Sequence, residues 1–209
     1  MLKIGLTGGI GSGKTTVGNL FANLNQPNNL LSIIDTDIIA RQIVEVNKPT
    51  YKKIVDTFGA SILHEDLTIN RAALRKLIFE NITAKRQLEA ITHPAIQKEV
   101  HQILSKLTTK YCIIVIPLLF ETKSDYQLDR ILVVDSDENI QIERTIQRDK
   151  VLAEDVKLIM KSQLDRETRL KQANDIIVNN GDLDDLSSQV EKLHYLYLKL
   201  NLESQNKHK

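Results

Sequence analysis

Residues 2–16, LKIGLTGGIGSGKTT, contain five glycines and pass from a short apolar run to a glycine-rich stretch that ends in a lysine and two threonines. Within this stretch, Gly8 to Thr15 match the pattern G-x-x-x-x-G-K-[ST] without a mismatch. An amphipathic run follows, so the order is strand, glycine loop and helix. Such a loop turns backbone N–H groups towards a phosphate, and the helix start adds a favourable dipole. The residues that define the apolar face of this helix are Val17, Leu20, Phe21 and Leu24.

The loop predicts a nucleoside triphosphate site. Lys14 would reach the β- and γ-phosphates, and the Thr15 hydroxyl would ligate Mg²⁺. A dinucleotide fingerprint is excluded, because Lys14 stands where that pattern needs a small third residue after Gly9 and Gly11. The remaining alternative is a glycine-rich turn without a ligand.

The rest of the chain alternates buried strands with helices, which predicts an open, mostly parallel α/β sheet of five strands flanked by helices. Two helical stretches, 38–107 and 137–172, interrupt this alternation and are expected to close over ligands. The expected strands are LKIGL from residue 2, LLSIID ending at Asp35, YCIIVI at 111–116, RILVVD ending at Asp135 and DIIVN at 175–179.

Composition narrows the function classes. The 209 residues carry 28 Lys and Arg against 27 Asp and Glu, a net charge of +1, which argues against a nucleic-acid-coating protein. The sequence shows neither a membrane span nor a signal peptide. Cys112 is the single cysteine and is expected to be a buried core thiol in a reducing compartment, so we expect a cytoplasmic protein. The sequence does not predict an oligomeric state.

A GTPase switch is disfavoured. The chain has no N-K-x-D motif late in the sequence, and Gly59 of the D-x-x-G match at Asp56 to Gly59 is more simply a helix C-cap. A non-catalytic nucleotide-dependent binding module stays open as an alternative.

The second expected strand favours phosphoryl transfer. It places Asp35 and Asp37 at its carboxyl end, beside the glycine loop. Transfer to an alcohol needs a carboxylate that orients the hydroxyl and accepts its proton, which Asp37 could do, or it could help to hold Mg²⁺. Alternatively, either aspartate caps a helix starting at Ile38. Arg41, one turn later, either faces the same cleft or is solvated.

Ordered motifs carry a more specific signal. GLTGGIGSGKTT is followed by DTDIIARQ, THPAIQ, IPLLFE, ILVVD, TIQRD and ANDIIVNNG, and in this order and spacing they resemble the dephospho-coenzyme A kinase family along nearly the whole chain. The resemblance implies ATP-dependent phosphorylation of the ribose 3′-hydroxyl of dephospho-CoA, the last step of coenzyme A synthesis. Another small-molecule or nucleoside kinase on the same scaffold is the alternative.

The resemblance also implies a three-part organisation. The P-loop NTPase core would comprise 1–37, 108–136 and 173–200, with a helical substrate-binding domain at 38–107 and a helical lid at 137–172. A polar tail at 201–209 ends in ESQNKHK, which we expect to be disordered.

The resemblance also implies roles for individual residues, according to their positions in these motifs. Asp37 is expected at the acceptor hydroxyl with Arg41 nearby, and Arg144 and Arg148 in the lid are expected to neutralise the transferring phosphoryl group. Arg166 and Arg169 are expected on a solvated helical face. The residues expected to bind ATP are Gly9, Gly11, Ser12, Gly13, Lys14, Thr15, Thr16, Asn179 and Gly181, the last two through backbone contacts with adenine.

Four further positions are expected to contact the substrate. His93 and Pro94 should begin a helix of the substrate domain, where His93 either caps the helix or contacts substrate. Pro117, Leu118 and Glu121 should line the cleft, unless Glu121 is a structural salt-bridge partner.

Three features depart from the family pattern. Thr36 replaces a common alanine, the linker at 24–32 is longer, and Asn174 stands where aspartate is usual. Any role that requires charge at position 174 is therefore in doubt.

Overall fold

The computed structural model describes residues 1–25, 29–122 and 125–206. The five expected strands are all present, within two residues of the expected limits: β1 (Leu2–Gly8), β2 (Leu31–Asp35), β3 (Tyr111–Val115), β4 (Arg130–Asp135) and β5 (Asp175–Val178). They form one parallel sheet in the order β2-β3-β1-β4-β5. The predicted parallel α/β fold is therefore confirmed.

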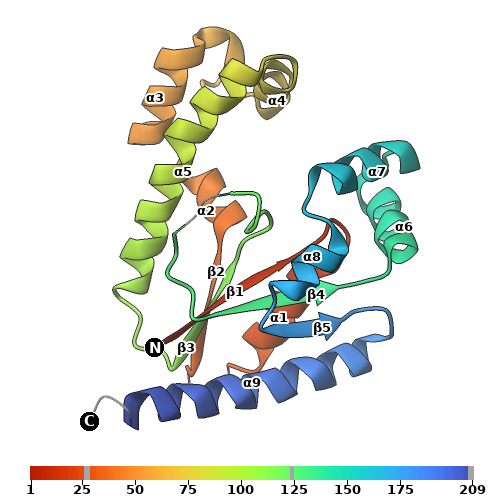
Figure 1. Cartoon of the computed structure of the whole chain (residues 1–209). Helices are drawn as coiled ribbons and strands as arrows, with labels where there is room; N and C mark the ends of the chain where they lie inside the picture. The colour runs from red at the N-terminus through yellow and green to blue at the C-terminus, as the bar shows by residue number, and fades with distance from the viewer. Residues whose placement is uncertain (26–28, 123–124, 207–209) are drawn as a thin grey trace. The chain divides into compact units, whose positions relative to one another are not determined.

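Ten helices accompany the sheet in the described part of the chain. Those between β1 and β3 are α1 (Lys14–Asn23), α2 (Thr36–Gln42), α3 (Pro49–Phe58), the 3-10 helix η1 (Ala60–Ile62), α4 (Arg71–Glu80) and α5 (Ile82–Leu104). Those after β4 are α6 (Glu138–Asp149), α7 (Ala153–Ser162), α8 (Arg166–Lys171) and α9 (Leu183–Asn206). Figure 1 labels helices α1 to α9.

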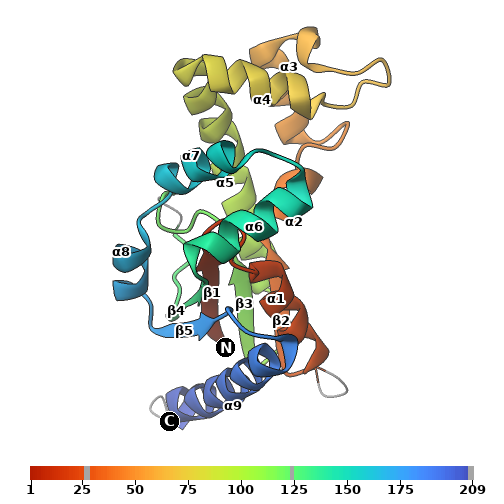
Figure 2. The same cartoon turned by 90° about the vertical axis from the view of Figure 1, so that its right-hand side faces the viewer.

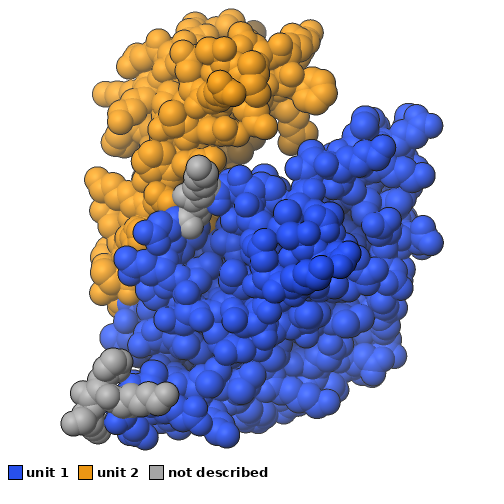
Figure 3. All heavy atoms as spheres, in the orientation of Figure 1, with its two compact units in different colours: residues 1–35, 107–209 blue, residues 36–106 orange. Residues whose placement is uncertain are grey.

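The chain divides into two compact units (Figure 3). Unit 1 contains residues 1–35 and 107–209 and holds the whole sheet, whereas unit 2 contains residues 36–106 and is helical apart from the isolated bridge between Leu63 and Ile69. In unit 2, Ile54, Ile62 and Leu74 form a small core of its own. Assigning substrate binding to the second unit stays a prediction.

One face of the sheet carries the main core. Buried strand residues such as Ile4 and Leu6 pack against Val17 and Phe21 of α1, and α9 adds its own apolar stripe to the same cluster. Helices α1 and α9 contact each other here (Figures 1 and 2). The predicted apolar faces of both helices are thus the faces that they bury. The α9 residues that contribute are Leu186, Val190, Leu193 and Tyr197.

The strand order corrects one expectation. Asp35 ends β2 at the same sheet edge as the glycine loop, but β3 lies between β2 and β1, so the two strands are not neighbours. Helix α2 also begins at Thr36 rather than at Ile38, which makes Asp37 its second residue.

The expected helix start at His93 and Pro94 is wrong. Both residues lie inside α5, which begins eleven residues before His93. The side chain of Asn81 caps this helix by accepting hydrogen bonds from the backbone N–H groups of Thr83 (2.9 Å) and Ala84 (3.1 Å). Pro94 therefore occupies an interior position, where it cannot donate to the carbonyl of Ala90.

The tail expectation is also wrong in part. Helix α9 continues to Asn206, so residues 203–206 of ESQNKHK are helical rather than disordered, and Asn201 of the expected polar tail is completely buried. Residues 207–209 lie outside the described residues, as do residues 26–28 of the longer linker.

Other expectations are confirmed. Gly59 is the C-cap of α3, with a φ of 76° and its N–H donating to the carbonyl of Val55. Cys112 is buried in β3, and burial raises the pKa of its thiol to about 12. Among the described residues, no helix is both long and apolar enough to span a membrane.

Candidate active site

The glycine loop joins the carboxyl end of β1 to the start of α1. Gly11 and Gly13 have φ values of 70° and 95°, in the left-handed region that other residues rarely adopt. A Cβ on Gly11 would overlap the carbonyl oxygen of Gln141, and a Cβ on Gly13 would overlap Nδ2 of Asn179. Both glycines are therefore required by conformation and by close packing.

The side chain of Lys14 lies over this loop. Its Nζ donates to the carbonyl oxygens of Gly8 (2.9 Å) and Gly9 (2.8 Å), so the ammonium stands at the positive end of the α1 dipole. Thr15 and Thr16 expose their side chains in the first turn. A cation, exposed hydroxyls and a helix start in one place fit an anionic, metal-bound phosphate group.

Ser12 is placed differently from its neighbours in the loop. It is buried, its N–H donates to the carbonyl of Gly9 (3.2 Å), and its hydroxyl has no hydrogen-bond partner among the described residues. Its carbonyl accepts from Nδ2 of Asn179 (2.8 Å).

Asn179 contacts both the glycine loop and helix α6. Besides the bond to Ser12, its carbonyl accepts from the Ser136 hydroxyl (3.0 Å) and from Nη1 of Arg144 (3.0 Å). Its N–H donates to the carbonyl of Asp135 (2.8 Å). The expected contact of Asn179 with adenine stays a prediction. The structure shows a second role that the sequence did not reveal: the buried Asn179 side chain holds the glycine loop through its bond to Ser12.

The two predicted lid arginines differ in their surroundings. Arg144 on α6 is half-buried and held by Asn179, whereas Arg148, one turn later, is exposed and forms a bidentate pair with its neighbour Asp149 (2.7 Å for both bonds). These hydrogen bonds raise the pKa of Arg148 and lower the pKa of Asp149. The geometry thus brings Arg144, but not Arg148, into the network around the loop.

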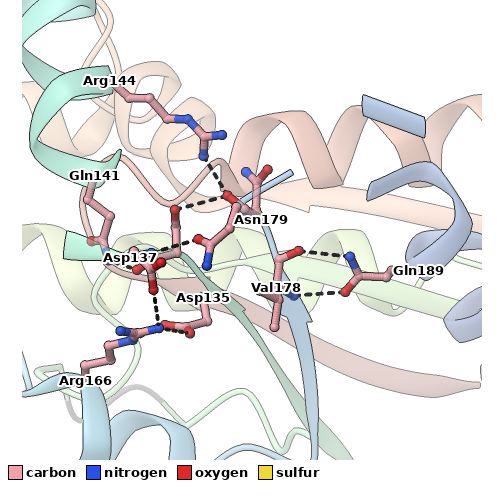
Figure 4. A network of polar contacts seen from close by, with 10 residues as sticks. Asp135, Asp137, Gln141, Arg144, Arg166, Val178, Asn179 and Gln189 are labelled. Atoms are coloured by element: carbon pink, nitrogen blue, oxygen red, sulfur yellow. Dashed lines mark hydrogen bonds and ion pairs between the residues drawn. The ribbon is translucent and has the colours of Figure 1, made fainter. Parts of the chain in front are cut away.

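The expected solvated helical face is wrong for Arg169 and only partly right for Arg166, whose side chain is 38% exposed. Arg166 donates two hydrogen bonds to Asp135 (2.8 and 2.7 Å) and one to Asp137 (3.0 Å) (Figure 4). Its bonds to Asp135 are the main reason why its pKa is raised. Arg169 is only 8% exposed, and burial lowers its pKa. A Cβ on Gly9 would lie 2.7 Å from Nη1 of Arg169, so this guanidinium lies against the glycine loop.

The segment after β3 contributes backbone and one carboxylate. The Pro117 carbonyl accepts a long hydrogen bond from the Thr7 hydroxyl (3.5 Å), and Leu118 is exposed. Glu121 accepts from the backbone N–H of Leu164 (2.8 Å), so its carboxylate holds the segment between α7 and α8 by a hydrogen bond.

Three predicted residues lie in unit 2. Asp37 and Arg41 are both exposed on α2, four residues apart and therefore on one side of the helix, while Ile39 faces inward. His93 is half-buried in the middle of α5. Their roles towards a substrate stay predictions.

Sequence reasoning missed several residues around the loop. Gln141 and Thr145, one turn apart on α6, are buried against Gly11, and Gln163 accepts a hydrogen bond from the N–H of Ile10 (3.0 Å). The only signal in the sequence was the i, i+4 spacing of Gln141 and Thr145 on either side of Arg144. This spacing does not distinguish residues that contact the loop from residues on an exposed polar face.

Comparisons with known proteins agree with this geometry. The family model described as dephospho-CoA kinase matches residues 2–185. A dephospho-CoA kinase from Photobacterium profundum is 46% identical over 200 residues, which cover 96% of this chain and 98% of the relative. The chain belongs to the dephospho-CoA kinase family.

Solved structures support the same assignment. A dephospho-CoA kinase from Campylobacter jejuni is 28% identical with a TM-score of 0.68, and the match covers 95% of this chain and 98% of that one. A Thermus thermophilus protein reaches a TM-score of 0.80 at 27% identity, covering 93% of this chain and 96% of that one.

Membership of the dephospho-CoA kinase family makes the departure at Asn174 interpretable. Its Oδ1 accepts from the N–H of Ile131 (2.7 Å), and its own N–H donates to the carbonyl of Ile131 (2.9 Å). An amide oxygen accepts this bond as a carboxylate would, so the contact seen here requires no charge at position 174.

Proposed function

We propose that this protein transfers the γ-phosphate of ATP to the 3′-hydroxyl of the ribose of dephospho-CoA, giving coenzyme A and ADP, the last step of coenzyme A synthesis. The observation that carries the proposal is the glycine loop with Lys14 over it, in a chain that belongs to the dephospho-CoA kinase family. A family of P-loop kinases uses ATP as the phosphate donor. We propose Mg²⁺ as the accompanying ion.

The loop residues fit this donor. Gly11 and Gly13 supply the left-handed backbone that the loop needs, and the Lys14 ammonium would bind the β- and γ-phosphates. Thr15 would ligate Mg²⁺, which supplies charge neutralisation across the β- and γ-oxygens. We propose that Gly181 and the backbone of Asn179 contact the adenine.

On the acceptor side, we propose that Asp37 orients the ribose hydroxyl and accepts its proton. Arg41, on the same side of α2, would bind the anionic substrate, with His93, Pro117, Leu118 and Glu121 as further contacts. Residues 38–107 would form the substrate domain and 137–172 the lid. Arg144 would neutralise the transferring phosphoryl group, because Asn179 holds its guanidinium beside the loop. Arg148 would do the same after leaving Asp149.

A coupled ADP-release assay tests the proposal. The purified protein, with ATP and Mg²⁺, should release ADP with dephospho-CoA and give a product 80 Da heavier, whose phosphate lies on the ribose 3′-oxygen (mass from the added HPO₃ group, about 80 Da). Adenosine, AMP and shikimate serve as competing acceptors. Faster turnover with any of these three would instead indicate another small-molecule kinase, and ATP binding without turnover on all four would indicate a binding module.

We also propose a cytoplasmic location. The single cysteine is free and buried, which suits a reducing compartment.

A further inference from the structure

The segment between α7 and α8 contacts the glycine loop directly. Oε1 of Gln163 accepts a hydrogen bond from the backbone N–H of Ile10 (3.0 Å). Gln163 is the C-cap of α7, and its own N–H donates to the carbonyl of Met160 (3.1 Å). The lid segment and the loop are thus joined by a bond between residues 153 positions apart.

Neighbouring contacts fix the position of Gln163. The N–H of Leu164 donates to Oε1 of Glu121 (2.8 Å), and the carbonyl of Leu164 accepts from Nη2 of Arg169 (2.5 Å). Arg169 is buried and packs against Gly9, the residue before Ile10. Both peptide groups of the segment at 163–164 are therefore held, and one side of the glycine loop is covered.

A loop with four glycines between residues 8 and 13 loses much conformational entropy when it binds a phosphate group. Any contact that orders the loop before binding reduces this loss and raises affinity. The bond from Ile10 to Gln163 is such a contact, because it fixes a peptide group in the middle of the loop.

We propose that Gln163 is a positioning residue for the glycine loop: it holds the Ile10 amide and so preorganises the loop for the triphosphate. Glu121 and Arg169 support it by fixing the segment that carries it. This inference rests on the proposed function only in taking ATP as the loop's ligand, and it does not depend on which acceptor is phosphorylated.

The test replaces Gln163 with methionine, which keeps the length of the side chain and removes the acceptor. Gln147→Met is the matched control, because Gln147 is exposed on α6 and its side chain bonds to Glu143 of the same helix. Amide hydrogen exchange of Ile10, measured by NMR in the free protein, reports the contact itself. Calorimetry with Mg²⁺ and a non-hydrolysable ATP analogue, without any acceptor, reports loop affinity.

A single neutral hydrogen bond is worth about 1 kcal/mol, which corresponds to roughly a 5-fold change. Gln163→Met should therefore speed exchange of the Ile10 amide and raise the Kd for the analogue by about 5-fold each, whereas Gln147→Met should change neither. Glu121→Met removes the acceptor for the N–H of Leu164 and should also speed exchange of the Ile10 amide and raise the Kd. In the double variant with Gln163→Met, Glu121→Met should change these two quantities by less than it does alone.

Unchanged exchange of Ile10 in folded Gln163→Met, or faster exchange without loss of affinity, would overturn the proposal. Additive effects of the Gln163 and Glu121 substitutions would overturn the supporting role of Glu121. Because no acceptor is present in these measurements, their outcome is separate from the identity of the phosphorylated substrate.

Discussion

Replacement of Arg166 with methionine should destabilise unit 1 through the aspartate that it leaves behind. Arg166 forms two hydrogen bonds to the carboxylate of Asp135 at 2.8 and 2.7 Å, and the Asp135 side chain is only 7% exposed. Methionine preserves much of the aliphatic part of the side chain and removes the guanidinium. The carboxylate at the end of β4 then loses its ion-pair partner.

The magnitude follows from the two exposures. Removing one partner of a fully buried ion pair typically costs about 3–5 kcal/mol, whereas an exposed pair contributes about 0–1 kcal/mol. Since the Arg166 side chain is 38% exposed, water can reach the aspartate after the substitution, and the loss is expected to be about 2–3 kcal/mol. For a chain of this size, this corresponds to a fall in Tm of roughly 4–12 °C.

The second partner of Arg166 provides an internal control. Asp137 lies at 3.0 Å from the guanidinium, but its side chain is 56% exposed, so Asp137→Asn should cost less than about 1 kcal/mol. Thermal and urea unfolding of both variants measure the difference. Asp135→Asn combined with Arg166→Met should regain part of the stability, because the orphaned charge is gone.

A loss of stability in Arg166→Met no larger than that in Asp137→Asn would refute the expected magnitude. So would a double variant that recovers no stability when the Asp135 charge is removed. Either result would mean that Asp135 is adequately solvated without its arginine.

Three further outcomes are expected. Lys14→Ala should abolish most turnover while the protein stays folded, because the γ-phosphate loses its principal cation; near-normal kcat would refute the assignment of the loop. Asp37→Asn should lower kcat by roughly 100-fold or more with ATP still bound, as measured by steady-state kinetics and calorimetry; a loss confined to ATP affinity would indicate a metal-site residue instead. His194 accepts from or donates to the Tyr111 hydroxyl (2.6 Å), and burial lowers its pKa, against a smaller opposing effect of Glu191. The unfolded chain therefore binds the proton first, so stability should fall as pH drops below about 6.5 towards the lower folded pKa, and His194→Gln should reduce the difference in Tm between pH 7.5 and 5.5; an unchanged difference would exclude His194 as its source.

Local sequence patterns predicted the elements of unit 1 well, because each pattern reflects a requirement close by in the chain. A buried parallel strand needs a continuous apolar run, and a phosphate loop needs glycines whose φ values other residues rarely adopt. Helix starts were less predictable: Asn81, and not Pro94, marks the start of α5, since an asparagine cap is a stronger signal than a proline that the helix accommodates in its interior.

The surroundings of charged side chains could not be predicted in the same way. Arg148 and Arg169 look alike in the sequence, yet the first is exposed beside Asp149 and the second is buried against Gly9. The difference depends on how the α7–α8 segment packs over the loop, and residues more than 150 positions apart make that contact.

By itself the sequence determined the donor half of this protein: the strand, the glycine loop, the helix start, and the position of Lys14 within them. It also determined the family, through the order of its motifs. Only the tertiary structure decided that β3 separates β2 from β1, that Asn179 clamps the loop, and that Gln163 holds Ile10. The physical reason is the distance along the chain between the interacting residues. Backbone conformation follows from neighbouring residues, whereas burial, ion pairing and the partners of polar groups depend on segments that only folding brings together.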